Sequence, residues 1–424
     1  MNLKENGISY KHVTSNRFKT TLLSVTFYTS LDKNAAANAL SVALMSKGTP
    51  KYADYYSFQR RLAGLYGASI TSSVSKAGDR QELNISITVN DDKYSLGGES
   101  TVFEAGNLLL DMLFGYYLSG ETFPDNAVLR EKRLLKETIM NRFNDKRVFA
   151  RRRCEEIMCE GEPYGLSPNG TVEEVEKLTD SDIRSGMTRL LKESFISIVT
   201  IGAEEPAGFI ENFNKLIASV GRDYKALSND IAKKTTQLKV VEEKMAVKQG
   251  KLVMGLRSDV GENLPDSVKT WIMTDIFGGG PYSKLFCNVR EKMSLCYYCA
   301  ARGIRTKGLI FIESGVEKEN IESARTAILD QFNRVKNGEI SDTEFSSSKL
   351  ALSDAFRSLV ADQGSLAGWY DARALSDSSL SPEDVANEVE NVKLSDVITA
   401  AKSYELDTVY ILRPDENALK EDTL

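Results

Sequence analysis

The sequence predicts an α+β fold made of two similar domains, each a β-sheet with helices packed against it. Two observations lead to this prediction: short motifs recur at one constant offset, and strand-like and helix-like segments follow in the same order in both halves. A chain of 424 residues is also too long for a single hydrophobic core. We therefore expect one domain at 1–222 and a second at 246–424, joined by a polar, lysine-rich linker at 223–245.

The duplication has an offset of 214 residues, the difference between Leu166 and Leu380, which begin two copies of a Leu-Ser-Pro motif. Two more pairs of motifs keep that offset: Glu174-Val175-Glu176 with Glu388-Val389-Glu390, and Asp182-Ile183 with Asp396-Val397. Each copy continues into a helix-like segment and then a β-rich one, at 195–202 in the first half and 408–412 in the second. We predict that these are the last strands of their halves.

The earlier elements come in pairs as well. In the first half Leu83, Ile85, Ile87 and Val89 alternate with other residues, which is the pattern of a strand with one buried face. The second half holds a capping box at Ser341-Asp342-Thr343-Glu344, which predicts the start of a helix. The paired elements are the strands 22–29 and 251–258, a helix after the first of these and one at 264–277, the short helices 58–66 and 285–297, and the strands 83–89 and 309–312.

The composition excludes several classes of protein. A net charge of -6, with Lys and Arg interspersed among Asp and Glu, gives no basic surface for nucleic acid. No apolar run reaches the roughly 18 residues that a membrane helix requires, and the first residues lack the apolar core of a signal peptide. We therefore predict a cytoplasmic protein that binds neither nucleic acid nor membrane.

The histidine content limits the chemistry further, because His12 is the only histidine in the chain. Zinc sites commonly take two or three imidazoles, and Ser-His-Asp or Cys-His catalysis needs one that is correctly placed. His12 lies near the start of the chain with no ligand-like neighbours. Most hydrolytic metal sites therefore cannot be built from this chain, and we expect no cofactor in it.

The chain contains five cysteines, and this odd number fits reduced thiols better than a disulfide framework. Cys296-Tyr297-Tyr298-Cys299 spells C-x-x-C, which could be half of a zinc knuckle with Cys154 and Cys159, or a redox pair. The segment 295–302 is strand-like, however, and residues three apart on a strand point to opposite faces. No glycine supplies the tight turn of a knuckle, so both roles are disfavoured.

One segment indicates a family. It runs Phe277-Gly278-Gly279-Gly280-Pro281-Tyr282-Ser283-Lys284-Leu285-Phe286, continues through Val289-Arg290-Glu291-Lys292 and ends at Leu295-Cys296-Tyr297. This closely resembles the second-half signature of the pitrilysin/insulinase family of zinc peptidases, which includes mitochondrial processing peptidase. Three parts of the first half also resemble motifs of that family: Lys47-Gly48-Thr49, Glu137 and the run from Tyr164-Gly165 to Gly170-Thr171. The resemblance covers nearly the whole chain and implies two homologous α/β roll domains that face each other as a half-shell.

The chain departs from the family in the metal site. In active members a His-x-x-Glu-His motif precedes Lys-Gly-Thr, and aligning on that tripeptide puts Ala39, Val42 and Ala43 where the first His, the Glu and the second His belong. Without the imidazoles zinc has no tetrahedral site, and without the carboxylate its bound water has no base. Glu137 matches the remaining ligand but cannot hold a metal alone, and the favoured interpretation is an ordinary helix-surface or salt-bridged carboxylate.

The other half of the family's active site is retained. In the family an Arg and a Tyr seven residues apart on the second domain complete the site, and Arg290 and Tyr297 match this motif and spacing. A phenol and a guanidinium stabilise the negative charge that develops on the tetrahedral intermediate of peptide hydrolysis. The structural alternative is that Arg290 pairs with Glu291 or Glu317 and that Tyr297 packs in the sheet.

The resemblance also implies a division of labour, because some members of the family work as two unlike chains of which only one carries the zinc motif. We expect this chain to be the subunit without it, in a heterodimer whose zinc-bearing, homologous partner supplies Zn and base while Arg290 and Tyr297 act in trans. The substrate would be a short or unfolded peptide enclosed by four domains. The alternative is a chain without any catalytic part, which serves as a peptide-binding or scaffolding protein in a homodimer.

Overall fold

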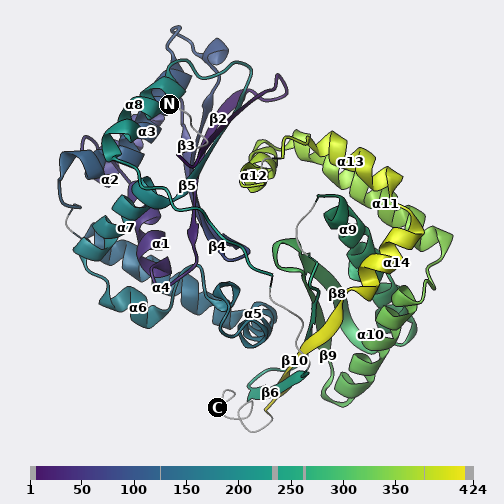
Figure 1. The fold of residues 1–424 in the computed structure, drawn as a ribbon. Coiled ribbons are helices and arrows are strands. Elements are labelled where there is room, and N and C mark those ends of the chain that lie inside the picture. The colour runs from purple at the N-terminus through teal and green to yellow at the C-terminus, as the bar shows by residue number, and fades with distance from the viewer. Residues whose placement is uncertain (1–5, 125, 232–236, 261–263, 377, 416–424) are drawn as a thin grey trace. The chain divides into compact units, whose positions relative to one another are not determined.

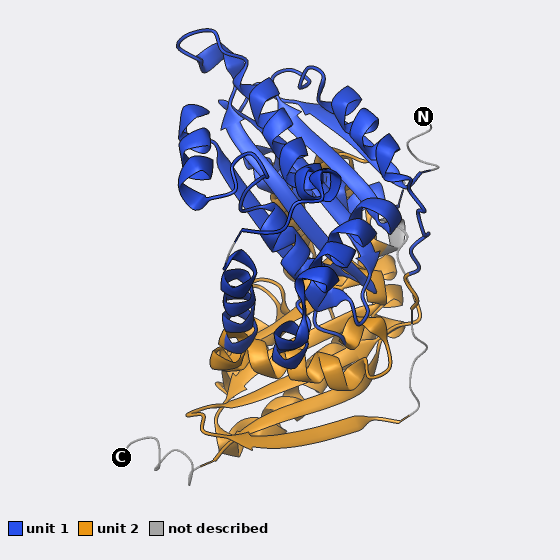
Figure 2. Cartoon of the chain, turned by 90° about the vertical axis from the view of Figure 1, so that its left-hand side faces the viewer, with its two compact units in different colours: residues 1–140, 166–228, 359–379 blue, residues 141–165, 229–358, 380–424 orange. Residues whose placement is uncertain are grey.

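The computed structural model of the chain describes residues 6–124, 126–231, 237–260, 264–376 and 378–415. The chain forms two compact units, each assembled from separate stretches of the sequence (Figure 2). Unit 1 contains 1–140, 166–228 and 359–379, and unit 2 contains 141–165, 229–358 and 380–424. Each half of the chain therefore contributes one segment to the unit that is built mainly from the other half.

A five-stranded sheet lies in each unit, and the two sheets have the same strand order (Figure 1). In unit 1 the order is β1 (Ile8–Thr14), β5 (Phe195–Gly202), β2 (Thr20–Ser30), β4 (Arg80–Asn90) and β3 (Ser69–Ala77). In unit 2 it is β6 (Lys239–Met245), β10 (Glu405–Pro414), β7 (Gly250–Arg257), β9 (Leu309–Val316) and β8 (Cys296–Ile304). The pairs β1–β5 and β6–β10 are parallel and the other pairs are antiparallel. This strand-for-strand match confirms the predicted α+β fold with its duplicated sheet.

Helices pack against both sheets, with short 3₁₀ turns between them. Those of unit 1 are α1 (Ala35–Met45), α2 (Tyr55–Gly64), α3 (Thr101–Ser119), α4 (Ala127–Asn144), α6 (Val172–Lys177), α7 (Asp180–Glu193), α8 (Phe209–Val220) and α12 (Gln363–Ala374). Those of unit 2 are α5 (Lys146–Met158), α9 (Leu264–Gly278), the π-helix η3 (Leu285–Lys292), α10 (Ile321–Lys336), α11 (Asp342–Ser358), α13 (Pro382–Asn391) and α14 (Leu394–Lys402). Within the described ranges, no helix has the length and apolar character needed to cross a membrane.

Most predicted elements are found where the sequence places them. The segments β5 and β10 are the last strands of their halves, and Leu83, Ile85, Ile87 and Val89 of β4 are all buried. The capping box at the start of α11 is also present. The Ser341 N–H donates to the Glu344 carboxylate at 2.8 Å, and the Glu344 N–H donates to Ser341 Oγ at 3.2 Å.

Two segments differ from the prediction. The helix predicted at 285–297 ends at Lys292, because Ser294 adopts a positive φ of 52° that turns the chain toward β8. In the segment 223–245, which the sequence predicts as a linker, the last seven residues form β6. This strand pairs with β10 at the edge of the sheet, and its charged residues hide the alternation of exposed and half-buried positions.

One face of the unit 1 sheet is covered by α12, a helix from the second half of the chain. Its residues Leu366 and Ala367 pack against Leu22, Val199 and Ile201 of β2 and β5. At the start of the helix the Gln363 amide donates to the backbone oxygens of Thr20 and Ile201, both at 2.9 Å. The opposite face of the sheet carries the main core of the unit, which includes residues of α1, α3, α7 and α8.

Unit 2 contains the reciprocal arrangement, in which α5 from the first half packs on β7, β9 and β10. Cys154 and Met158 of this helix lie in one buried cluster with Val253, Phe311 and Tyr410. The two helices occupy corresponding places in the duplication, because the offset of 214 carries 146–158 onto 360–372, which overlaps α12. Each copy has therefore placed the same helix on the sheet of the other copy.

A buried network of charges lies next to the end of α5. The side chain of Arg257 on β7 is 2% exposed, and its Nε donates to Asp407 Oδ2 at 3.0 Å. Its Nη2 lies 2.8 Å from Glu162 Oε1 and donates to the Met158 carbonyl at 3.0 Å. Lys307 Nζ adds a second cation 3.4 Å from Glu162 Oε2. The network ties the end of the exchanged helix to the sheet that it covers.

The contact of α12 with its sheet also buries a carboxyl group. Asp371 is 4% exposed and accepts hydrogen bonds from Thr26 Oγ1 at 2.8 Å and from Ser197 Oγ at 2.6 Å. Burial raises the pKa of Asp371 from 3.8 to about 6, and the two hydroxyl donors oppose this shift only in part. The ionised carboxylate is therefore costly at neutral pH.

We expect Asp371 to make the protein less stable as the pH rises from about 4 to about 6. The folded state binds more protons than the unfolded state in this range, so the free energy of unfolding falls, by about 3 kcal/mol at most. In urea unfolding measured across this range, the slope of the free energy of unfolding against pH should be more positive for Asp371→Asn than for the wild type. The exposed control Asp354→Asn should keep the wild-type slope. An unaltered slope in Asp371→Asn would show that Asp371 does not contribute.

Candidate functional site

Arg290 and Tyr297 line one open pocket of unit 2, with a volume of about 420 Å³. Arg290 lies on η3 and Tyr297 lies near the start of β8. The remaining wall is formed by Glu291, Ser294, Leu295, Cys296, Glu317 and Asn320. The structure thus brings together the two residues that the sequence singles out in the second half.

A β-bulge directs Tyr297 out of the sheet. In the ladder of β8 and β9, Cys296 pairs with Val316 and Tyr298 pairs with Gly315, so Tyr297 is an extra residue in the register. Bulges commonly re-aim a side chain in this way. Tyr297 is 56% exposed, and its hydroxyl donates to Glu317 Oε1 at 2.6 Å. The alternative in which Tyr297 packs in the sheet is therefore wrong.

The same bulge changes which residues share a face. Ser314 and Val316 lie two apart on β9 and point to one face of the sheet, so their partners Cys299 and Cys296 point to that face as well. The prediction that these cysteines point to opposite faces is wrong, because it assumed a regular strand.

The polar groups of the pocket are weakly held by the chain itself. The hydrogen bond to Glu317, together with the negative charge of that residue, raises the pKa of Tyr297, so its hydroxyl keeps the proton at neutral pH. Arg290 Nε lies 3.5 Å from Glu291 Oε1, and the guanidinium lies 4.6 Å from the centre of the Phe286 ring. Exposed ion pairs contribute at most about 1 kcal/mol, so a bound anion can displace Glu291.

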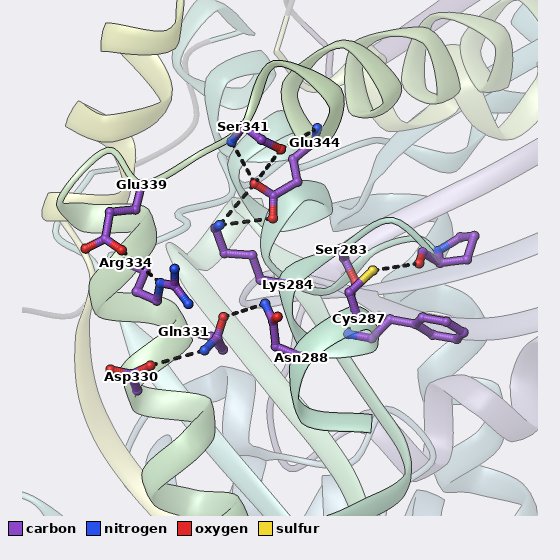
Figure 3. Close-up of polar contacts among 12 residues, drawn as sticks. Ser283, Lys284, Cys287, Asn288, Asp330, Gln331, Arg334, Glu339, Ser341 and Glu344 are labelled. Carbon is purple, nitrogen blue, oxygen red and sulfur yellow. Dashed lines mark hydrogen bonds and ion pairs between the residues drawn. The ribbon is translucent and has the colours of Figure 1, made fainter. Parts of the chain in front are cut away.

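The backbone beneath Arg290 is held more firmly (Figure 3). Lys284, just before η3, is 4% exposed, and its Nζ lies 3.0 Å from each carboxylate oxygen of Glu344 on α11. Within η3, Asn288 Nδ2 donates to Gln331 Oε1 on α10 at 2.8 Å. Before this helix, Gly278 packs so closely that a Cβ atom there would lie 2.6 Å from the Ala301 nitrogen. The pocket therefore presents an exposed guanidinium on a fixed support.

The positions aligned with the zinc motif lie on α1 in unit 1. Ala39 and Val42 are 2% and 1% exposed, and Ala43 is half-buried. Glu137 lies on α4 with a side chain 47% exposed, and its Oε1 lies 3.7 Å from Arg133 Nη1. No group of three or more His, Cys, Asp or Glu side chains among the described residues is arranged to hold a metal ion. At the three positions of the zinc motif, α1 thus carries apolar side chains that cannot bind a metal ion.

Glu317 is the site residue that the sequence assigned differently. From the sequence it was one of two candidate partners for Arg290, whereas the structure pairs Glu291 with Arg290 and Glu317 with Tyr297. Glu317 comes next to Tyr297 through the pairing of β8 with β9, which ends at Val316. The sequence could not predict this pairing, because the pairing depends on the bulge and no sequence pattern marks the bulge.

Comparisons with known proteins show which families and folds the chain is similar to. Residues 177–352 match the model of the Peptidase M16 inactive domain. The chain is 29% identical over 417 residues to the probable inactive metalloprotease YmfF of Bacillus subtilis (strain 168), covering 98% of both chains. A conserved protein from Enterococcus faecalis V583 has the same fold, with a TM-score of 0.88 and 24% identity over 96% of this chain and 97% of that one.

A second solved structure carries the family name itself. The peptidase M16 inactive domain from Pseudomonas fluorescens superimposes with a TM-score of 0.79 and 15% identity, over 97% of each chain. The predicted resemblance to the pitrilysin/insulinase-type peptidases, and to their members without a zinc motif, is confirmed by these matches. The chain is thus similar to the Peptidase M16 inactive domain over residues 177–352 and to a probable inactive metalloprotease over nearly its whole length.

Proposed function

We propose that this chain is the zinc-lacking subunit of a two-chain M16 metallopeptidase and that it contributes Arg290 and Tyr297 to peptide hydrolysis in trans. The observation that carries the proposal is the bulge at Tyr297, which leaves a phenol hydroxyl exposed in the same pocket as an exposed guanidinium. The zinc positions Ala39 and Val42, in contrast, are filled by buried apolar side chains. The pocket that contains Arg290 and Tyr297 is thus open, whereas the positions of the zinc motif are filled by apolar side chains.

The chemistry of these two groups suits the second half of a metallopeptidase site. The partner's His and Glu side chains would hold zinc, which would supply an activated water, and the carbonyl oxygen of the attacked peptide would gain negative charge. The Tyr297 hydroxyl would donate its hydrogen bond to that oxygen instead of to Glu317. Arg290 would separate from Glu291 and stabilise the negative charge electrostatically. Both interactions are stronger with the intermediate than with the neutral peptide, so they lower the barrier.

The partner in this proposal is a homologous chain with the intact His-x-x-Glu-His motif, which holds the zinc and the base. A structurally similar chain, with a TM-score of 0.75, comes from Complex III2 of Candida albicans, a multi-chain assembly, which supports a role beside a partner. The substrate would be a short or unfolded peptide. No disulfide joins any of the cysteines among the described residues.

The test is the cleavage of a quenched, unstructured peptide by this chain alone, by its zinc-motif homologue alone and by their mixture, with and without a chelator. Activity that arises only in the mixture and is lost with chelator would support the proposal. Full activity of the homologue alone, without binding between the chains, would refute it. The remaining function would then be peptide binding or scaffolding by this chain, for instance as a homodimer.

Replacing Tyr297 with Phe should lower the turnover of the reconstituted pair by about 10²-fold, which is the usual loss for one oxyanion donor. Assembly of the pair should be unchanged, because Tyr297 is 56% exposed and its hydroxyl interacts with the Glu317 and Gln249 side chains of the same unit. The matched control is Tyr282→Phe, which removes another phenol that donates to a carboxylate, Asp275, at 2.6 Å but lies outside the pocket. Equal turnover of the two variants would remove Tyr297 from the mechanism.

A further inference from the structure

The bulge that exposes Tyr297 also brings two cysteines together. In a regular strand, residues three apart are separated by about 10 Å and point to opposite faces. A disulfide needs Cα atoms about 4.4 to 6.8 Å apart, so a regular strand forbids one here. The register of β8 puts two residues in the space of one, and Cys296 and Cys299 become neighbours on one face.

The two thiols contact each other directly and differ in accessibility. A hydrogen bond joins the Cys296 and Cys299 side chains, and the Ser314 hydroxyl interacts with both. Cys296 is half-buried and lines the open pocket, whereas Cys299 is 6% exposed. A reagent in the pocket therefore reaches Cys296 first, and Cys299 is the thiol behind it.

Their acidities differ in the same sense. The hydrogen bond from Cys299 lowers the pKa of Cys296 to about 7, and Arg290 contributes to this shift through its charge. The same hydrogen bond and burial raise the pKa of Cys299 well above its usual value. At neutral pH Cys296 is therefore partly ionised beside a protonated Cys299, and a thiol whose pKa lies near the ambient pH is the most effective attacking group.

We propose that Cys296 and Cys299 form a reactive dithiol that small soluble disulfides oxidise to an intramolecular disulfide. The Cys296 thiolate attacks one sulfur of the small disulfide, which releases one thiolate and leaves a mixed disulfide on Cys296. The Cys299 thiol then transfers its proton to the released thiolate and attacks Cys296 Sγ, which expels the second small thiolate. That thiolate takes up from water the proton that Cys296 had lost. Two electrons pass from the protein to the small disulfide, which leaves as two thiols.

The other cysteines do not share this arrangement. Cys154 and Cys159 are fully buried, and burial raises the pKa of the Cys154 thiol. Cys287 is exposed, and its thiol lies 3.2 Å from the Pro281 carbonyl. Cys287 therefore serves as an internal reference for an accessible thiol of the same unit that carries an adduct without resolving it.

The proposed disulfide would span Tyr297 and Tyr298 and so lock the bulge. The disulfide would therefore restrict the position of Tyr297 in the pocket, because Tyr297 is the extra residue of the bulge. The dithiol chemistry itself does not depend on the proposed peptidase function and can be tested on this chain alone.

The experiment treats the reduced, native, full-length chain at neutral pH with bis(2-hydroxyethyl) disulfide, then digests it with trypsin without reduction. Cleavage after Lys292 and Arg302 gives one peptide, 293–302, that contains both cysteines. We expect this peptide to be two hydrogen atoms lighter and free of adduct, whereas the peptide with Cys287 should carry a hydroxyethylthio group. Dithiothreitol should reverse both changes.

Two variants separate the roles of the thiols. In Cys299→Ser the adduct should stay on Cys296, because no resolving thiol remains, and in Cys296→Ser the buried Cys299 should remain unmodified. The wild-type result alone can overturn the proposal. A stable adduct on Cys296, or free thiols in peptide 293–302 under conditions that modify Cys287, would show that the pair does not form a disulfide.

Discussion

Residues 1–228, produced as a separate polypeptide, are expected not to reach a stable fold. This fragment contains all five strands of the unit 1 sheet but lacks α12. The apolar face formed by Leu22, Val199 and Ile201 would then be exposed to water, and its burial would no longer offset the conformational entropy of the chain. Near-ultraviolet circular dichroism during heating should show no cooperative transition.

Mixing or coexpressing 1–228 with 229–424 should restore the fold, because each fragment carries the helix that the other sheet requires. The restored complex should unfold cooperatively, close to the midpoint of the intact chain. A cooperative transition of 1–228 alone at that midpoint would contradict the prediction. It would instead support independent domains with the boundaries near 222 that the sequence suggests.

Replacing Arg257 with Met is expected to lower the free energy of unfolding by about 3 to 5 kcal/mol. The substitution keeps most of the side-chain volume but removes the cation that lies 3.0 Å from Asp407 Oδ2. The Asp407 side chain is 2% exposed, so its charge would stay buried without that partner. Urea unfolding at neutral pH measures the loss.

The matched control is Arg413→Met, which removes an arginine of the same sheet that pairs with Glu242 at 2.6 Å and is 23% exposed. Because this pair is partly exposed, its loss should cost about 1 kcal/mol or less. The double variant Arg257→Met with Asp407→Leu should recover part of the stability, since the buried Asp407 charge is removed together with the cation that faces it. Equal losses for Arg257→Met and Arg413→Met would show that the buried network adds nothing.

The sequence predicted the repeated elements because strands and helices leave local periodic patterns. The alternating residues of β4 and the repeated motifs sufficed to identify the duplication. They could not predict the exchange of α5 and α12, because an amphipathic helix shows which face is apolar and not which sheet it will cover. The reciprocal contacts depend on long-range packing that has no local signal.

The candidate site was predictable only in part, for a similar reason. Arg290 and Tyr297 were found through a motif, and their presence in one pocket agrees with that choice. Their catalytic role stays a prediction. The bulge was missed because it consists of one extra residue in a register, which no residue type marks here. The pairing of Tyr297 with Glu317 and the contact of Cys296 with Cys299 both follow from that single residue.

The exchange of helices also delays the completion of unit 1 during protein synthesis. The last strand of the unit 1 sheet leaves the ribosome with Gly202, but α12 begins only at Gln363, 161 residues later. At about 5 to 20 residues per second, the ribosome needs about 8 to 30 s to supply that helix. Throughout this interval the apolar face of the nascent first half has no helix to cover it, so the yield of the protein depends on what shields that face until α12 has been synthesised.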